Sequence, residues 1–211
     1  MRRAPERASY EQQEIERILD AGILCHVGFV FEERPVLIPT LYWREGNRIF
    51  LHGSRASRMM RAIEGAEVCI GVSHLDGLVL AHSAFHHSAN YRSVCLFGRP
   101  EPVPAGEQEH HLRVFMEDLF PGRWDRLRPV RRRELNATRL LAMPIDEASA
   151  KVRRGPPGEP EEDREWPVWG GVFPLLTLAG APEPDPGSVA AALPPPALAA
   201  ARFSRPPEDD G

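Results

Sequence analysis

The chain has 211 residues, 42% of them hydrophobic and 27% charged, and a formal net charge of -4. This composition predicts one globular domain with extensions, and the slight acidity argues against a broad basic surface for nucleic acid or an anionic membrane. No apolar run approaches the ~18 residues of a membrane span and no apolar leader follows Met1, so we expect neither membrane insertion nor secretion.

The first predicted element is a helix over residues 9–21, because apolar residues recur there at helical spacing. Ser9 and Gln12 stand in the positions of a capping box, and Gly22 is placed to end the helix.

Three strands are predicted next, over residues 23–31, 36–43 and 48–52. Each is rich in branched and aromatic residues, and turn-forming residues separate them at 32–35 and 44–47. Short connections between sequential strands indicate an antiparallel meander.

The later part of the chain continues the alternation of strands and short helices. The predicted elements are a helix over 54–63, strands over 68–73 and 78–83 joined near Asp76 and Gly77, a strand over 91–97, a helix over 107–120, a helical turn over 134–139 and a strand over 140–145 with no identified partner. About six strands suit a mainly β fold with flanking helices, a small closed or split β-barrel. We place this domain at residues 1–178 and a Pro- and Ala-rich flexible tail at 179–211.

The stretch from Leu51 to Arg58 joins a strand to a helix through Gly53, Ser54 and Ser57. A Gly- and Ser-containing turn that enters a helix offers backbone N–H groups, hydroxyls and a positive helix end to a phosphate. Neither the Walker spacing nor Gly-x-Gly-x-x-Gly is present, which favours a mononucleotide phosphate over ATP or a dinucleotide. The alternative is that the serines only cap the helix and the arginines are solvated.

The second constellation runs from Leu80 to Val94 and holds three histidines within six residues. Imidazole clusters can bind metals, but no carboxylate or cysteine stands among them at ligand spacing. We therefore expect no metal there and interpret the loop as hydrogen-bonded or solvated. Tyr91, Arg92 and Ser93 suit a planar ligand with ring carbonyls or a phosphate, unless Tyr91 simply belongs to the core.

Cys25, Cys69 and Cys95 are odd in number and lie in apolar stretches without Cys-x-x-Cys spacing, which indicates small core residues and a reducing cytoplasm. No Gly-x-Ser-x-Gly elbow is present, which disfavours a hydrolase. The segment 166–174 places two tryptophans beside two glycines. We expect them to seal a barrel end or an interface more than to contact a cofactor.

Several short motifs resemble one known group of proteins. They are Ile18-Leu19-Asp20, Cys25-His26-Val27-Gly28, Ile38-Pro39-Thr40, Leu51 to Ser54 with Ser57-Arg58, Ala84 to Ser88, Asn90 to Val94, Phe97-Gly98, Glu147 to Lys151 and Pro167-Val168-Trp169. Together they resemble the pyridoxamine 5'-phosphate oxidase-like, flavin-nucleotide-binding family, in its branch related to nitroimidazole-resistance proteins. The resemblance covers roughly residues 9–175.

The resemblance implies a split barrel that forms a homodimer with FMN at the subunit interface. By motif position, Ile38, Pro39 and Thr40 line the flavin ring, His52, Ser54, Ser57 and Arg58 hold its phosphate, Tyr91, Arg92 and Ser93 lie near the flavin, and Trp169 is a weaker candidate. The chain departs from the oxidase pattern at Met59, where a lysine often follows the Ser-Arg pair, and in lacking a recognisable Arg/His pair for pyridoxal phosphate. These departures argue against pyridoxamine-phosphate oxidase activity itself.

The leading hypothesis is therefore an FMN-dependent oxidoreductase that acts on an unidentified small molecule, with the flavin carrying the hydride or electron. The alternative is a non-catalytic flavin- or haem-binding module of the same fold. The sequence does not distinguish FMN from a deazaflavin, and it assigns no catalytic residue.

Overall fold

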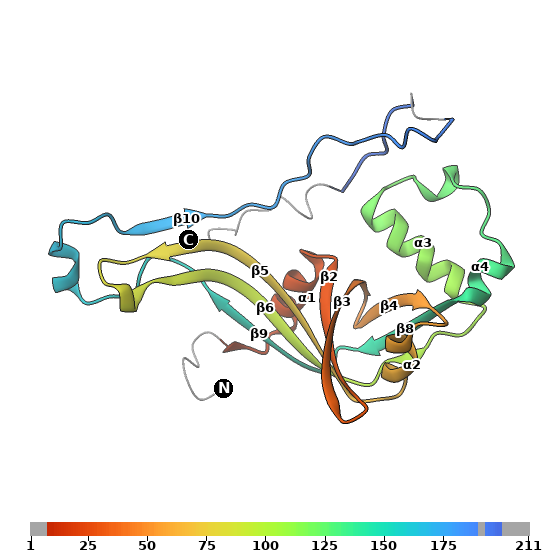
Figure 1. Ribbon diagram of the computed structural model, residues 1–211, viewed down its shortest axis with the longest axis horizontal. Helices are drawn as coiled ribbons and strands as arrows, with labels where there is room; N and C mark the ends of the chain where they lie inside the picture. The colour runs from red at the N-terminus through yellow and green to blue at the C-terminus, as the bar shows by residue number, and fades with distance from the viewer. Residues whose placement is uncertain (1–7, 190–192, 200–211) are drawn as a thin grey trace.

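The computed structural model describes residues 8–189 and 193–199, in which strands pair into one antiparallel sheet (Figure 1). The strands are β1 (Ala8–Ser9), β2 (Leu24–Phe31), β3 (Arg34–Glu45), β4 (Arg48–Ser54), β5 (Val68–Leu80), β6 (Ser88–Gly98), β7 (Glu101–Pro102), β8 (Thr138–Pro144), β9 (Glu147–Arg153) and β10 (Gly171–Pro174). Their order is β1-β9-β6-β5-β2-β3-β4-β8-β7, and β10 pairs with β5.

The helices are short and lie on the sheet. They are α1 (Gln12–Asp20), α2 (Arg58–Ile63), α3 (Gln108–Leu119) and α4 (Arg132–Ala137), with 3-10 turns at Ala84–His86, Trp124–Arg126 and Glu161–Glu165. Among the described residues, no helix combines the length and apolar character needed to cross a membrane. The predicted meander and the helices near 9–21, 54–63 and 107–120 are confirmed, although the elements begin and end at different residues than predicted.

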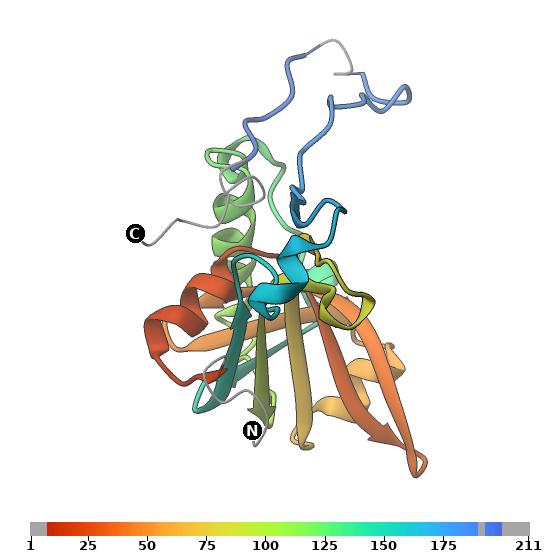
Figure 2. The same cartoon turned by 90° about the vertical axis from the view of Figure 1, so that its left-hand side faces the viewer.

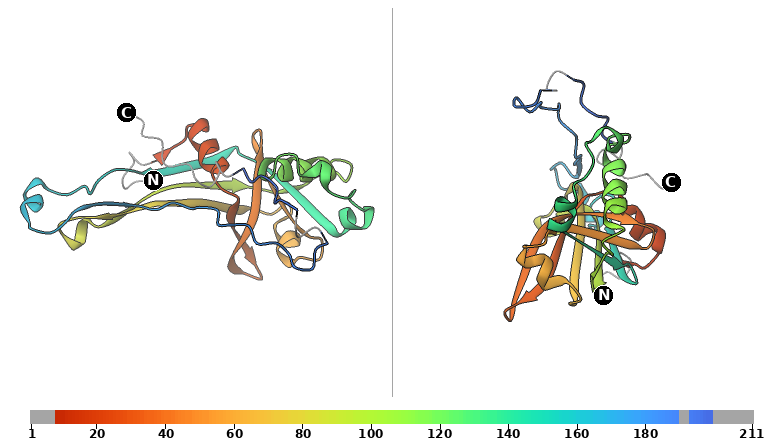
Figure 3. Two further views of the ribbon diagram at one scale, coloured as in Figure 1. Left: turned by 90° about the horizontal axis from the view of Figure 1, so that it is seen from above. Right: turned by 90° about the vertical axis from the view of Figure 1, so that its right-hand side faces the viewer.

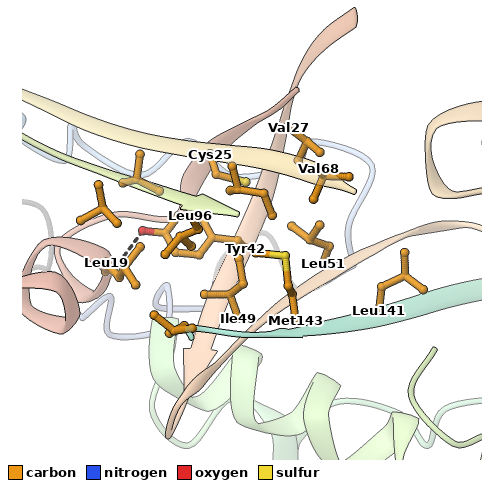
Figure 4. Packing of buried hydrophobic residues seen from close by; sticks show 14 of the residues in the cluster. Leu19, Cys25, Val27, Tyr42, Ile49, Leu51, Val68, Leu96, Leu141 and Met143 are labelled. Atoms are coloured by element: carbon orange, nitrogen blue, oxygen red, sulfur yellow. Dashed lines mark hydrogen bonds between the residues drawn. The ribbon is translucent and has the colours of Figure 1, made fainter. Parts of the chain in front are cut away.

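The sheet curls around one apolar core, as a split barrel does. Buried side chains from α1, α2 and seven strands share this core, which a flat sheet could not achieve. At its centre the hydroxyl of Tyr42 donates a hydrogen bond to the carbonyl of Leu19, 2.5 Å away, and so ties β3 to the end of α1 (Figure 4). A split barrel with a mainly antiparallel sheet was expected and is confirmed.

A second apolar cluster lies on the opposite face of β3 and β4. Trp43 and Phe50 stack at 5.5 Å, and Phe115 of α3 stacks on Trp43 at 4.7 Å. Leu119 of α3 and Leu140 of β8 complete this layer, so α3 covers the outside of the barrel there.

Strands β5, β6 and β9 extend beyond the barrel as an arm, with β10 alongside (Figure 3). In the view along this arm, α1 lies on one side of the strands and the β2–β3 hairpin projects on the other (Figure 2).

Two predicted features are wrong. The segments 68–73 and 78–83 are not a hairpin: the first segment and the first half of the second belong to one strand, β5, which ends at Leu80 and pairs along its length with β6. Asp76 and Gly77 form a register shift instead of a turn, because Arg92 of β6 holds the Asp76 carboxylate at 2.8 and 2.9 Å. Ser9 does not cap α1, because it is paired in β1 and its hydroxyl accepts from the N–H of Glu11, the N-cap residue.

Strands β9 and β10 were not predicted. The sequence of β9, from Glu147 to Arg153, holds one branched residue and alternates small with polar side chains, so it carries little strand signal. The strand over 140–145 is β8, and its missing partners are β4 and β7. The flexible-tail prediction at 179–211 falls partly outside the described residues; within them, the N–H of Ala199 donates to the carbonyl of Leu119.

Tyr42→Phe is expected to lower the free energy of unfolding by about 1–2 kcal/mol, because it leaves the buried Leu19 carbonyl without this donor. Urea unfolding followed by circular dichroism measures the change. Tyr10→Phe is the matched control, since Tyr10 is 70% exposed and its variant should unfold like the parent. Equal losses in both variants would refute the role given to the Tyr42 hydroxyl.

Candidate functional site

The outer face of the sheet, turned away from the core, has a floor of small side chains. The register places one row of residues across five strands in the order Pro39, His26, Gly71, Cys95 and Ser149. A parallel row holds Ser73, Ser93 and Lys151. The small residues of these rows, on β5, β6 and β9, leave room over the sheet that larger side chains would fill.

A cavity of about 370 Å³ lies over this floor. Gly28, Gly71, Ser93 and Cys95 line it, and Lys151 stands at its β9 side. The ammonium of Lys151 lies 5.7 Å from the ring centre of Tyr91, which places a cation beside an aromatic face at this side of the cavity.

A second cavity, of about 380 Å³, arises from the pairing of β5. One edge of β5 pairs with β6, so β2 and β10 must share the other edge. The β2 ladder ends at Gly71 and the β10 ladder begins at Gly77. Within the described ranges, residues 72–75 have no strand partner on that edge, while the carbonyl of Asp76 accepts from the N–H of Leu175 at 3.0 Å. The cavity opens there against Gly22, Leu24 and Leu175.

His26 and Ser73 line both cavities, which therefore adjoin at the edge of β5, and we call the two together the outer-face groove. Its second half contains Arg92, whose charge is balanced by Asp76 at 2.8 Å. His74 lies there too, within 3.0 Å of the Ile18 carbonyl. Burial lowers the pKa of His74, so its imidazole is neutral near pH 7.

The structure places the predicted flavin-contacting residues on two faces. Ser93, Pro39 and Tyr91 lie on the outer face by register, and Ser93 lines the groove there. Arg92 lines the second cavity from the inner face, because it pairs with His74 and neighbouring residues of a strand point to opposite faces. Ile38 packs against the core instead. Thr40, opposite the core residue Cys25, shares the inner face with Ile38.

The residues predicted to hold a phosphate lie near the ends of β4 and α2, and none of them lines either cavity of the groove. Ser57 caps α2 by accepting from the N–H of Met60, and Ser54 accepts from the N–H of Ala56. The guanidinium of Arg58 lies over the ring of Phe31 at 5.1 Å. The phosphate role of this set remains a prediction.

His52, another member of that set, lies under α3. Its ring is 5.9 Å from Trp43 and 5.6 Å from Phe115, and its Nδ1 is buried without a hydrogen-bond partner among the described residues. Burial lowers its pKa, which makes the ring neutral at pH 7.

Trp169 lies just before β10 and is 59% exposed, with its ring 5.0 Å from Phe173. In the histidine loop, the carboxylate of Glu159 lies 2.7 Å from Nδ1 of His82 and also accepts from the backbone N–H of His82. Nδ1 of His87 lies 2.9 Å from the carbonyl of Ser83.

The interpretation of all three cysteines as core residues is wrong for two of them. Cys25 is fully buried, and burial raises the pKa of its thiol to about 12. Cys69 and Cys95 lie on the outer face with their sulfur atoms 3.2 Å apart, because their strands place alternate side chains outward. Burial and the contact with Cys69 raise the pKa of Cys95 to about 11.

Sequence reasoning missed most of the groove: His26 as a site residue, Gly71, Ser73 and Lys151. A signal was present in β5, where Cys69, Gly71 and Ser73 alternate with Val68, Ile70 and Val72. Such alternation of small and branched residues marks a strand with one face in the core and the other open.

A family model described as pyridoxamine 5'-phosphate oxidase matches residues 11–152. The chain belongs to this family. The resemblance drawn from the short motifs is thereby confirmed, and no curated protein matches the chain in sequence.

Two solved structures are similar to this member of the pyridoxamine 5'-phosphate oxidase family over most of its length. The flavocytochrome Anf3 from Azotobacter vinelandii is 44% identical, with a TM-score of 0.86 over 90% of this chain and 89% of that one. The FAD and haem binding protein from Mycobacterium smegmatis is 35% identical, with a TM-score of 0.85 over 90% and 94%. A proposed 5-nitroimidazole antibiotic resistance protein from Bacteroides thetaiotaomicron, 21% identical with a TM-score of 0.56 over 69% and 86%, shares the fold.

The lowered pKa of His52 predicts a pH-dependent stability. The unfolded chain takes up a proton near the ordinary histidine pKa of 6.5, whereas the folded chain does so only at lower pH, so stability is lost as pH falls through this window. His52→Phe is expected to reduce the loss measured by urea unfolding at about pH 7.5 and pH 5.5. His87→Phe, in the exposed loop, is the control and should keep the parent's pH dependence; identical behaviour of both variants would contradict the assignment.

Proposed function

We propose that this protein is a flavin-binding oxidoreductase that holds the isoalloxazine ring of the flavin in the outer-face groove. The observation that carries the proposal is the unpaired edge of β5 within the groove, beside a floor of glycine and serine. A planar ring needs a flat floor, and its carbonyl and N–H groups need partners such as free backbone groups. Family membership and two relatives above 30% identity support the same function.

The residues of the groove fit such a ligand chemically. Lys151 provides positive charge at the β9 side of the groove for phosphate or ring oxygens, and the guanidinium of Arg92, paired with Asp76, lines the second cavity. His26 stands at the junction of the two cavities and can hold or accept a proton beside the ring. A bound flavin supplies the hydride or electron chemistry, and these side chains orient it.

FMN is the flavin expected from the sequence, but the relative from Mycobacterium smegmatis is described as binding FAD and haem. We therefore treat FAD as an equal candidate. Haem binding is a second proposed function, favoured because the flavocytochrome and this FAD and haem binding protein each align over 90% of the chain.

The same outer face is proposed to pack against a second copy of the chain. Leu37, Leu75 and Phe97 are 67%, 53% and 41% exposed around the groove, and a homodimer would bury them. A partner chain would also cover the groove and exclude water from a bound ring.

The full chain, purified from a host that makes flavin and haem, is expected to show flavin absorption and to release about one flavin per chain on denaturation. Mass spectrometry of the released ligand distinguishes FMN from FAD, and an intense Soret band reports haem. A colourless protein that takes up neither FMN nor FAD when they are added would refute the flavin proposal, whatever its haem content.

Gly71→Leu is expected to weaken flavin binding at least tenfold, or about 1.4 kcal/mol, because its side chain projects into the groove. A Cβ at Gly71 meets no atom within 4 Å, so the fold should tolerate the change. Gly106→Leu is the matched control, because Gly106 also has open space around it and lies outside the groove. Flavin titration followed by fluorescence measures both variants, and equal affinities would place the flavin elsewhere.

A further inference from the structure

A second polar cluster lies where the end of β3 meets the first turns of α3. Glu45 of β3 and His110 and His111 of α3 each offer a ligand atom, and these atoms all lie within 4.8 Å of one another. None of the three lines the outer-face groove. Carboxylate oxygen and imidazole nitrogen together are ligands of zinc and of other divalent transition metals.

Two members of the cluster are already held in place by the protein. The indole N–H of Trp43 donates to Oε1 of Glu45 at 2.7 Å, and Nδ1 of His111 lies 3.0 and 2.9 Å from the two carboxylate oxygens. The His111 ring packs against Phe50 at 4.5 Å. The two side chains are only 19% and 14% exposed, so the pair is oriented and partly shielded from water.

The third member, His110, is exposed and stands at the mouth of the cluster, its ring edge-on to His111 at 5.2 Å. Glu107, one helical turn earlier, brings a carboxylate oxygen to 3.9 Å from Nε2 of His111. Two carboxylates beside two imidazoles make this corner attractive to a dication.

We propose that Glu45, His110 and His111 bind a divalent transition metal ion such as Zn²⁺, with a fourth position open to solvent. Zinc bonds of about 2.0–2.2 Å to nitrogen and oxygen place tetrahedral ligands about 3.3 Å apart. The contact between Glu45 and His111 is already close to that separation, and the exposed His110 can turn to close the set.

A metal at this position joins β3 directly to α3. The ion would then add to the stacking of Phe115 on Trp43, which holds the same helix on the barrel. Loading the site is therefore expected to raise the Tm, since anything that binds only the folded chain stabilises it.

The test is isothermal titration of the full, tag-free, chelator-treated chain with ZnCl₂. One Zn²⁺ per chain is expected, with an affinity that falls at least about tenfold in His110→Ala and in Glu45→Gln, since even residues behind the ligands cost that much when changed. His87→Ala removes an exposed histidine outside the cluster and should bind Zn²⁺ like the parent. Intense visible absorption of bound Co²⁺ should report a tetrahedral site in the parent and be lost in His110→Ala.

Absence of stoichiometric Zn²⁺ binding by the parent overturns the proposal, and so does equal binding by the parent, His110→Ala and Glu45→Gln. A His111–Glu45 pair that only ties α3 to the barrel would give the first result. Zn²⁺ binding is measured without flavin, so the metal-site proposal is tested independently of the proposed flavin function.

Discussion

Much of the molecule depends on two neighbouring residues of β3 that are both completely buried. Tyr42 points into the barrel core and Trp43 points to the opposite face, and each is 0% exposed. A strand with water on one side would leave one of them open. The barrel core is therefore covered by α1 and the opposite face by α3, and β3, like β4 and β8, contributes side chains to both apolar clusters.

The outer-face groove results from topology more than from any single motif. β2 and β10 are far apart in sequence, yet they meet the same edge of β5 and leave a gap between Gly71 and Gly77. Small residues of β5 and β6 then form a floor beside the gap. The shape of the groove thus follows from the pairing of β5 and from its small side chains, and no single catalytic side chain is needed to form it.

Local patterns in the sequence were enough to predict the meander, the helices and the family. They were not enough for β5, because Asp76 and Gly77 look like a turn unless the pairing of Arg92 with Asp76 is known. Strands β9 and β10 were missed for a related reason, since their pairing with distant strands compensates for weak strand-forming residues. At the candidate site, motif position placed Ser93 beside the groove, but it could not separate Ile38 from Pro39, whose faces are set by the register with β2.

β10 also protects one edge of the sheet against pairing with strands of other chains. It is four residues long and covers the stretch of β5 from Gly77 to Leu80. Without it, the arm would present an exposed row of N–H and C=O groups, a template for strand addition by foreign chains. Because β10 comes late in the sequence, a ribosome-bound chain completes the barrel strands before this cover exists, and the arm passes through a period of aggregation risk during synthesis.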